Sequence, residues 1–180
     1  NDAYADKLYR ILKKAGITIV PNPLINIHLQ GRYDKYPKRR GLTRIKELLM
    51  NGVNVALGHD CIMDPWYPLG RGDMMQVLFM TVHVAQLMGY DELVKSFDLI
   101  TFNAARALRI ESIYGIDVGK RADLVILDAF NEIEALAYLK RPLYVIKNGR
   151  IVSEKNVEEV KTVDPLSSKM VRLDERVLKQ

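Results

Sequence analysis

Two short apolar runs joined by a segment of helical pattern constrain the fold of this chain more than any other feature. The first run, residues 17–20, is β-branched throughout and ends at Pro21. The second run, residues 53–57, follows a segment in which Thr43 is a candidate N-cap and Gly52 a helix stop. A strand–helix–strand crossover of this kind predicts an α/β fold with two parallel strands, the first of them buried on both faces.

Long loops are expected to follow both strands. Residues 24–41 show no clean period and contain glycine and proline, and a second loop runs from residue 58 to Asp73. Because α/β folds carry their active sites at the C-terminal ends of parallel strands, we expect the functional residues within 22–41 and 58–73.

The rest of the chain contains further helical and β-like patterns. Helical spacing predicts one helix between Ala3 and Ala15 and another from Asp73 to about Met88. Shorter helices and then strands are expected at 91–97, 101–108, 122–127, 144–147 and 150–152. Asn148-Gly149 predicts a hairpin turn between the last two pieces.

Composition excludes several classes of protein. With 180 residues, 48% of them apolar, the chain can bury one core, and no apolar run has the roughly 18–20 residues of a membrane span. The single Cys61 rules out an internal disulfide and favours a reducing, cytoplasmic compartment. The net charge is +5, but the one dense basic cluster is residues 35–40, so we expect no nucleic-acid partner. The start at Asn1, without a leader, predicts a piece of a longer protein.

The segment Gly58-His59-Asp60-Cys61 directly follows the second strand. Asp60 can bind a divalent metal and accept a proton from water, which suits a hydrolase, or it can be a turn or N-cap residue. Cys61 can ligate zinc, line a substrate pocket, or pack as a small apolar side chain. The three histidines of the chain form no paired-ligand motif, so the sequence does not contain a complete zinc site.

Three further residues are candidates for substrate binding. His28 and Gln30 stand in the first loop and carry polar groups suited to a heterocyclic amide, although a structural role in the loop is an equal alternative. Trp66, the only tryptophan, can cover a flat ligand or serve as a buried anchor of its loop.

Several of these segments together resemble the bacterial cytosine deaminases of the amidohydrolase superfamily. The resemblance covers about residues 1–155. The segments that carry it are residues 22–32, 36–41, 58–60, 64–70, 103–106 and 119–125. It implies that residues 1–112 are the C-terminal strands and helices of a (β/α)8 barrel that is incomplete in this chain, with residues 113–155 part of a small β-sandwich. Residues 156–180 are then a tail that packs on the surface or frays.

The resemblance also implies a chemistry, the hydrolysis of cytosine to uracil and ammonia with one divalent zinc or iron ion. Asp60 would bind the metal and take part in proton transfer, Trp66 would help to close the pocket, and the substrate would be a small nucleobase-like molecule. The remaining metal ligands and the proton-shuttling glutamate would precede residue 1, so we expect the isolated chain to be inactive. Its partner would then be an N-terminal barrel segment or another chain, in a homo-oligomer.

One departure from the family pattern leaves the substrate open. An acidic residue stands at the position of Cys61 in the closest family members, so a cysteine there can shift specificity toward another ring. Isoguanine, creatinine or another cyclic amidine is one alternative. A non-catalytic module that dimerises through an exposed strand edge is the other.

Overall fold

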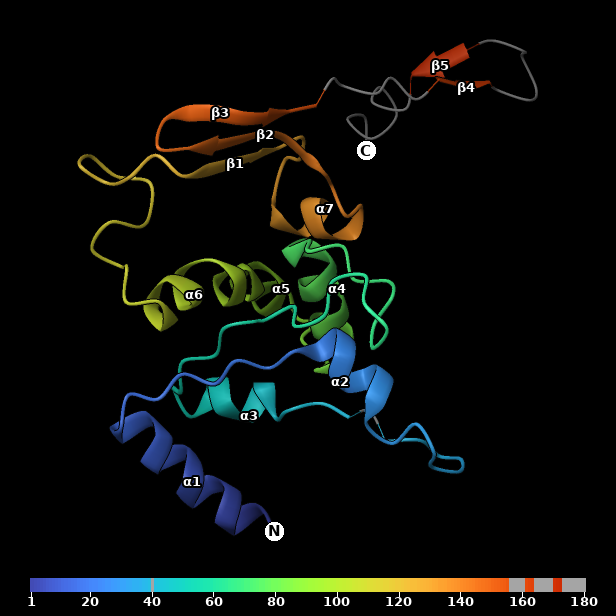
Figure 1. Ribbon diagram of the computed structural model, residues 1–180, viewed down its shortest axis with the longest axis vertical. Helices are drawn as coiled ribbons and strands as arrows, with labels where there is room; N and C mark the ends of the chain where they lie inside the picture. The colour runs from blue at the N-terminus through green and yellow to red at the C-terminus, as the bar shows by residue number, and fades with distance from the viewer. Residues whose placement is uncertain (40, 156–160, 164–169, 173–180) are drawn as a thin grey trace.

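The computed structural model describes residues 1–39, 41–155, 161–163 and 170–172, and it contains both helices and strands (Figure 1). The helices are α1 (Asp2–Lys14), α2 (Pro23–Leu29), α3 (Ile45–Met50), α4 (Met74–Val84), α5 (Tyr90–Ser96), the 3-10 helix η1 (Phe97–Ile100), α6 (Phe102–Ala107) and α7 (Glu132–Ala137). The strands are β1 (Leu124–Leu127), β2 (Pro142–Lys147), β3 (Arg150–Glu154), β4 (Lys161–Val163) and β5 (Met170–Arg172). No described helix is both long and apolar enough to cross a membrane.

The two apolar runs lie side by side and run in the same direction. Ile19 and Val55 form a parallel bridge, and the backbone N–H of Gly58 extends the pairing by donating to the carbonyl of Pro21 at 3.0 Å. The predicted parallel direction is therefore confirmed, but the two runs are joined by an isolated bridge and neither is one of the strands β1–β5; they are called the strand pair below. The first run, however, is not buried on both faces, since Ile17 is 46% and Val20 50% exposed.

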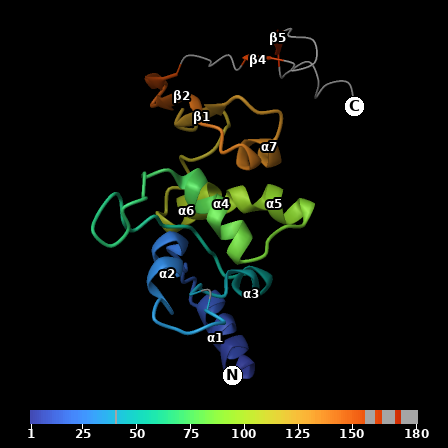
Figure 2. The same cartoon turned by 90° about the vertical axis from the view of Figure 1, so that its right-hand side faces the viewer.

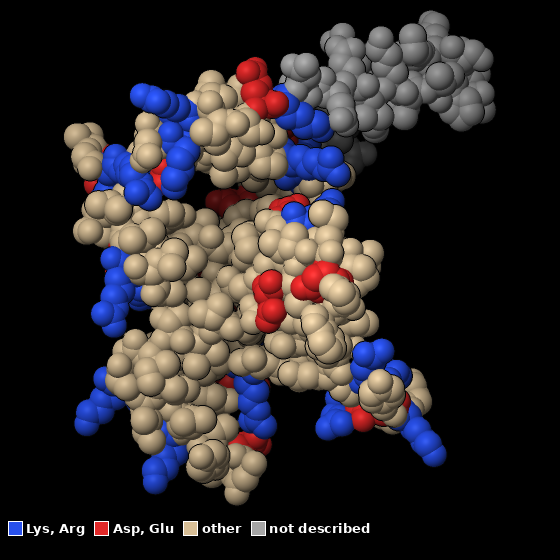
Figure 3. Space-filling model, in the orientation of Figure 1, with Lys and Arg blue, Asp and Glu red and all other residues tan. Residues whose placement is uncertain are grey.

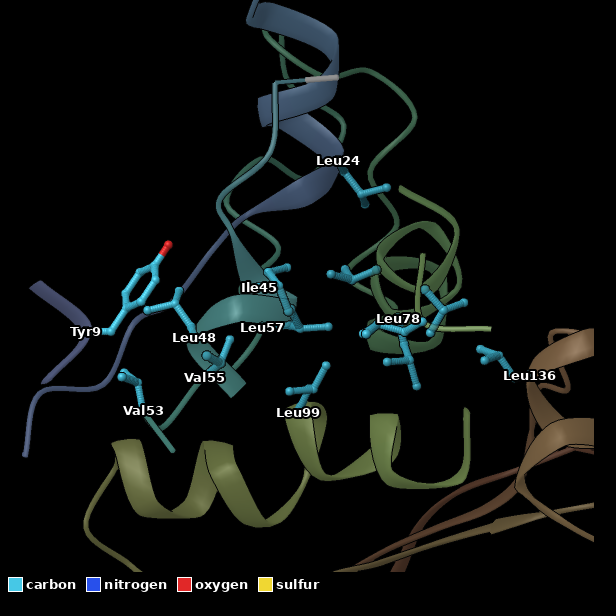
Figure 4. Close-up of a cluster of buried hydrophobic side chains, with 13 residues drawn as sticks. Tyr9, Leu24, Ile45, Leu48, Val53, Val55, Leu57, Leu78, Leu99 and Leu136 are labelled. Carbon is cyan, nitrogen blue, oxygen red and sulfur yellow. The ribbon is translucent and has the colours of Figure 1, made fainter. Parts of the chain in front are cut away.

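The second run forms the centre of the hydrophobic core. Val55 is fully buried, and the close-up in Figure 4 shows it beside Leu57, Leu48 and Leu99. Elements from residue 9 to residue 136 contribute to this one cluster, so helices and strand depend on each other for burial. Truncating a fully buried leucine such as Leu78 to alanine in a core of this kind costs about 2–5 kcal/mol.

The predicted loop at 24–41 is wrong in its first third, where α2 forms instead. Pro23 occupies the first turn of this helix, a position where its fixed φ is already helical and its missing N–H is not needed. Leu24 and Ile25 are buried and attach the helix to the core. Seven residues are too few to show the 3.6-residue period clearly, which is why the helix is not evident in the sequence.

Two helix boundaries also differ from the prediction. In α3 the cap position is Arg44, and no side chain caps the helix, so Thr43 is not the N-cap. Helix α4 begins at Met74, next to the expected start at Asp73, which is its N-cap and whose carboxylate accepts a hydrogen bond from the N–H of Met75 at 2.9 Å. That helix ends at Val84 rather than near residue 88, because Gln86 adopts a left-handed conformation with φ 56°.

The sheet β1–β2–β3 is antiparallel throughout and contains the predicted hairpin. Asn148 and Gly149 both have positive φ, 48° and 73°, as the two-residue turn requires. Helix α7 was not expected. It lies between the sheet and helices α4 and α5, and it contacts both of these helices (Figures 1 and 2). The Asn131 side chain caps α7 by accepting from the N–H of Glu134. The predicted tail, 156–180, lies mostly outside the described residues.

Basic side chains form separate groups around the edge of the face in Figure 3, and most of its centre carries no charge. One group lies where the loop after α2 projects, and within it Arg39 is paired with the carboxylate of Asp34. The face therefore has no continuous basic stripe of the kind that binds a nucleic-acid backbone.

Candidate active site

The C-terminal ends of the two parallel runs meet at one edge of the core. Asn22 follows the first run and Asp60 the second, 38 positions apart in the chain. The Asn22 amide nitrogen donates a hydrogen bond to Oδ2 of Asp60 at 3.2 Å. The edge at which we expected function thus brings together a carboxylate and an amide from different segments.

Asp60 is exposed and has a left-handed backbone, with φ 66°. Aspartate tolerates this conformation better than most side chains, but it remains uncommon outside turns and functional sites. Its second oxygen, Oδ1, accepts from the Cys61 thiol at 3.4 Å. The carboxylate is therefore presented to solvent while both of its oxygens have a partner from the chain.

Gly58 allows this close approach of the two segments. A Cβ atom at this position would lie 2.1 Å from Oδ1 of Asn22, a distance that no side chain can occupy. The same residue makes the backbone hydrogen bond to Pro21 described above. Glycine at position 58 is therefore needed for Asn22 to reach Asp60.

Cys61 is buried, with 6% of its surface exposed. Burial, together with the neighbouring carboxylates of Asp64 and Asp60, raises the pKa of the thiol to about 12. Its thiol donates to Oδ1 of Asp60 at 3.4 Å, so the side chain lies directly beside that carboxylate. A role of Cys61 as a zinc ligand or as a residue of the substrate pocket stays a prediction.

Asp64 fixes the start of the aromatic loop. Its Oδ1 accepts from the backbone N–H groups of Trp66 and Tyr67, both at 2.9 Å. The hydrogen bond from Tyr67 and then those from Cys61 and Trp66 lower the pKa of this carboxyl group, while burial opposes them. Trp66 itself is 64% exposed, so it is not a buried anchor of the loop.

His59 fastens the far end of the same loop. Its Nε2 accepts from the N–H of Gly72 at 3.1 Å, while its buried Nδ1 has no hydrogen-bond partner among the described residues. Gly70 packs so closely that a Cβ there would lie 2.8 Å from the imidazole Cε1. The loop from residue 61 to residue 72 is therefore held on the residue that precedes Asp60.

The candidates in the first loop lie farther from Asp60. His28 stands on α2, and its ring centroid is 6.1 Å from that of Tyr67, so the two long segments do meet. Gln30 is the exposed C-cap of α2. Among the described residues no hydrogen bond joins His28 or Gln30 to Asp60, and their part in substrate binding stays a prediction.

Asn22 and Tyr67 are the contacts that our sequence reasoning missed. Both lie within the segments where function was expected, but neither was selected as an individual residue. The rule that selected Asp60, a polar side chain immediately after a buried strand, applies equally to Asn22.

The described residues fit one ligand of a metal site and not a whole site. They contain no group of three or more histidine, cysteine, aspartate or glutamate side chains that could hold an ion. Asp60 has an exposed carboxylate that a divalent metal can reach, whereas Oδ1 of Asp64 already accepts from two backbone N–H groups. A catalytic zinc site usually has three protein ligands, so the others would have to come from elsewhere.

Comparison with known families identifies the class of protein. The Amidohydrolase family matches residues 1–153, and the chain therefore belongs to this family. Its relatives include deaminases, so the predicted resemblance to cytosine deaminase-like amidohydrolases is confirmed.

Two relatives share substantial sequence with the chain. The 5-methylcytosine deaminase of Klebsiella pneumoniae, solved with 5-fluorocytosine, is 43% identical with a TM-score of 0.85 over 90% of this chain and 39% of that one. The N-isopropylammelide isopropyl amidohydrolase of Pseudomonas sp. (strain ADP) is 40% identical over 111 residues, 62% of this chain and 28% of the relative. The chain thus spans well under half the length of each protein.

A second solved structure shares the fold at lower identity. An adenosine deaminase from Xanthomonas campestris with bound zinc is 22% identical, with a TM-score of 0.63 over 81% of this chain and 34% of that one. The family is generally metal-dependent, and this neighbour carries its metal in the solved structure.

Proposed function

We propose that the protein to which this chain belongs hydrolytically deaminates a cytosine ring, with 5-methylcytosine as its preferred substrate. The observation that carries the proposal is the 43% identity to 5-methylcytosine deaminase over 90% of the chain. In this reaction a C–O bond forms at the ring carbon that bears the amine, the C–N bond breaks, and ammonia leaves.

The side chain at position 61 supports the methylated ring as the substrate. Cys61 presents a small, uncharged thiol beside Asp60. A carboxylate at the same position would stay hydrated or need a partner, and it would be a poor neighbour for a methyl group. A buried thiol packs against apolar atoms at little cost.

Asp60 is the proposed catalytic residue and the one metal ligand that this chain supplies. Asp60 would hold a divalent zinc or iron ion together with ligands from outside this chain, and when bound the ion would supply a water of lowered pKa as the nucleophile. The Asp60 carboxylate accepts the proton that the attacking water gives up and returns it to the departing amine. Its exposed position at the edge of the strand pair is what allows this transfer.

The aromatic loop and α2 are the proposed walls of the pocket. Trp66 is exposed on the loop that Asp64 fixes, and it covers one face of the flat ring. His28, which faces Tyr67, and Gln30 at the end of α2 supply polar groups to the edge of the ring.

The proposed architecture is the C-terminal part of a (β/α)8 barrel. Residues 17–21 and 53–57 would be its last two strands within a unit 1–112, with 113–155 part of a β-sandwich. The exposure of Ile17 and Val20 supports this, because the interior and the outer helices of a complete barrel would cover side chains on the two faces of the strand. The preceding strands and the other metal ligands would come from an N-terminal segment, so the isolated chain is inactive.

The proposed setting is a cytoplasmic homo-oligomer, in keeping with the free thiol of Cys61. Light scattering on the full-length protein measures the assembly directly. If the full-length protein is a monomer at micromolar concentration, the proposed homo-oligomer is wrong, whereas the proposed deamination is unaffected.

Ammonia release tests the function. The chain alone and the chain extended by the N-terminal part of the barrel are each incubated with zinc or iron and with 5-methylcytosine, cytosine, isoguanine or creatinine. We expect activity only in the extended protein and fastest with 5-methylcytosine. Activity of the chain alone would contradict the assignment of the other metal ligands to an N-terminal segment. A preference for isoguanine or creatinine would show that the proposed substrate, 5-methylcytosine, is wrong.

A further inference from the structure

We propose that Asn22 is a positioning residue that holds the Asp60 carboxylate in its working orientation. This inference rests on the proposed role of Asp60 in deamination. The Asn22 amide nitrogen donates to Oδ2 of Asp60 at 3.2 Å across the gap between the two parallel runs. Asn22 touches the carboxylate but has no part in the bonds that form and break.

The backbone of Asn22 is held by a hydrogen bond, and its side-chain oxygen is confined by close packing. Its backbone N–H donates to Oδ1 of Asn26, one turn along α2, at 3.3 Å. Its side-chain oxygen lies over Gly58 at a distance that leaves no room for a Cβ atom there. With the oxygen on the glycine side, the –NH₂ group faces Asp60, and this orientation is the one that can donate to a carboxylate.

Asp60 needs such a partner because little else in its surroundings fixes its carboxylate. The side chain is exposed, and its left-handed backbone aims it away from the regular strand direction. Oδ1 has only the weak thiol donor of Cys61 at 3.4 Å. Carboxylates that bind metals are commonly hydrogen-bonded in turn by neighbours that orient them, and Asn22 has the chemistry and the position for this task.

The same strand pair offers a matched control at its other end. Asn54 also bridges the two runs through its amide nitrogen, which donates to Oγ1 of Thr18 at 2.8 Å and to the carbonyl of Asn103 at 3.1 Å. No candidate site residue is among these partners. Asn54 and Asn22 therefore make equivalent cross-strand contacts, one remote from Asp60 and one directly on it.

The test uses the full-length protein with three variants, Asn22→Ala, Asn22→Asp and Asn54→Ala. For Asn22→Ala we expect kcat for 5-methylcytosine to fall by about 10- to 100-fold while KM stays within about threefold. Zinc affinity, measured by competition with a chelating dye, should weaken by about tenfold. Asn22→Asp is nearly isosteric but has no N–H to donate and repels Asp60, so its kcat should fall further than that of Asn22→Ala. Asn54→Ala should lower the melting temperature and leave kcat and zinc affinity unchanged.

Several outcomes would overturn the proposal. An Asn22→Asp protein with the kcat and zinc affinity of the unmodified protein would show that the hydrogen bond to Asp60 does not matter. Unfolding of both Asn22 variants, with Asn54→Ala still folded, would make Asn22 a structural residue. If the unmodified protein deaminates none of the rings, the proposed function fails, whereas the zinc affinities still decide the role of Asn22.

Discussion

The two ends of the parallel strand pair are built from similar residues and differ in how completely their polar groups are satisfied. At the N-terminal end, the Asn54 amide donates to both Thr18 and Asn103, and its Oδ1 accepts from Arg106 at 3.5 Å. At the C-terminal end, Asp60 is exposed on a left-handed backbone and the buried Nδ1 of His59 has no partner among the described residues.

This difference between the two ends shows where the fold accommodates unusual backbone conformations and unpaired polar atoms. Both ends rest on the same buried Val55, so neither is intrinsically looser than the other. Unusual backbone conformations and unsatisfied polar groups cost free energy and persist where surrounding structure enforces them, often at functional sites. The same two strands can thus provide stability at one end and chemistry at the other.

The largest expected effect comes from Asp60→Asn in the full-length protein. Asparagine tolerates the left-handed backbone and can still accept from Asn22, so the fold should survive, but it cannot take a proton from water. We expect kcat to fall by about 10³-fold with an unchanged circular dichroism spectrum. If the Asp60→Asn protein retains a tenth or more of the activity, Asp60 is not the catalytic residue and the C-terminal end of the strand pair has no special chemical role.

A smaller effect is expected from Cys61→Asp, which changes the pocket wall without removing Asp60. The buried thiol would be replaced by a carboxylate next to Asp60 and Asp64. We expect kcat/KM for 5-methylcytosine to fall by about 10- to 100-fold relative to that for cytosine. The two substrates are compared on the same preparation, with Cys61→Ser as the uncharged control. If the ratio of kcat/KM for 5-methylcytosine to kcat/KM for cytosine is unchanged, Cys61 does not determine substrate specificity.

At the opposite end, Asn54→Ala should affect stability and not activity. The substitution leaves Thr18 and the Asn103 carbonyl without their donor, which costs about 1–3 kcal/mol of unfolding free energy. Urea denaturation measures this loss, and ammonia release measures kcat on the folded protein. A fall in kcat beyond the loss of folded material would mean that the two ends are coupled.

The smallest expected effect lies outside both ends, at Asp123 before β1. Its carboxylate accepts from Lys147 and from the N–H of Asn148, and these bonds, with Arg121, lower its pKa to about 2. A lowered folded pKa contributes stability that is present above the usual value of 3.8 and is lost as the pH falls toward 2. Asp123→Asn should therefore be less stable than the unmodified protein at pH 7, with the difference shrinking near pH 2. A pH-independent difference would contradict this assignment.

Much of the fold could be predicted because its signals are local and strong. Helix α1, the start of α4 near Asp73 and the hairpin turn at Asn148 were all evident from helical spacing and turn chemistry. The short α2 and α7 were not, since a helix of six or seven residues is defined more by its tertiary contacts than by its period. The exposure of Ile17 likewise depends on what covers it, which an apolar run alone does not reveal.

The candidate site was predictable in its location and not in its contacts. The rule that strand ends carry function selected Asp60, and the structure places this residue where the ends of the two parallel runs meet. The hydrogen bond from Asn22 depends on the absence of a side chain at Gly58, a steric condition between segments that are distant in sequence. The exposure of Trp66 could not be predicted either, because it depends on the turn in which the Asp64 side chain accepts from the backbone N–H of Trp66.

The loop from residue 61 to residue 72 is fastened at its base, where His59 accepts from Gly72 and the N–H of Met63 donates to the carbonyl of Gly70 at 2.9 Å. Its tip, residues 65–69, is held as well, since Asp64 accepts from the N–H groups of Trp66 and Tyr67 and the carbonyl of Leu69 accepts from the Gln76 side chain at 3.2 Å. The Trp66 side chain stays 64% exposed, so a substitution at this one position can change the outer surface of the loop while the backbone that carries it keeps its contacts.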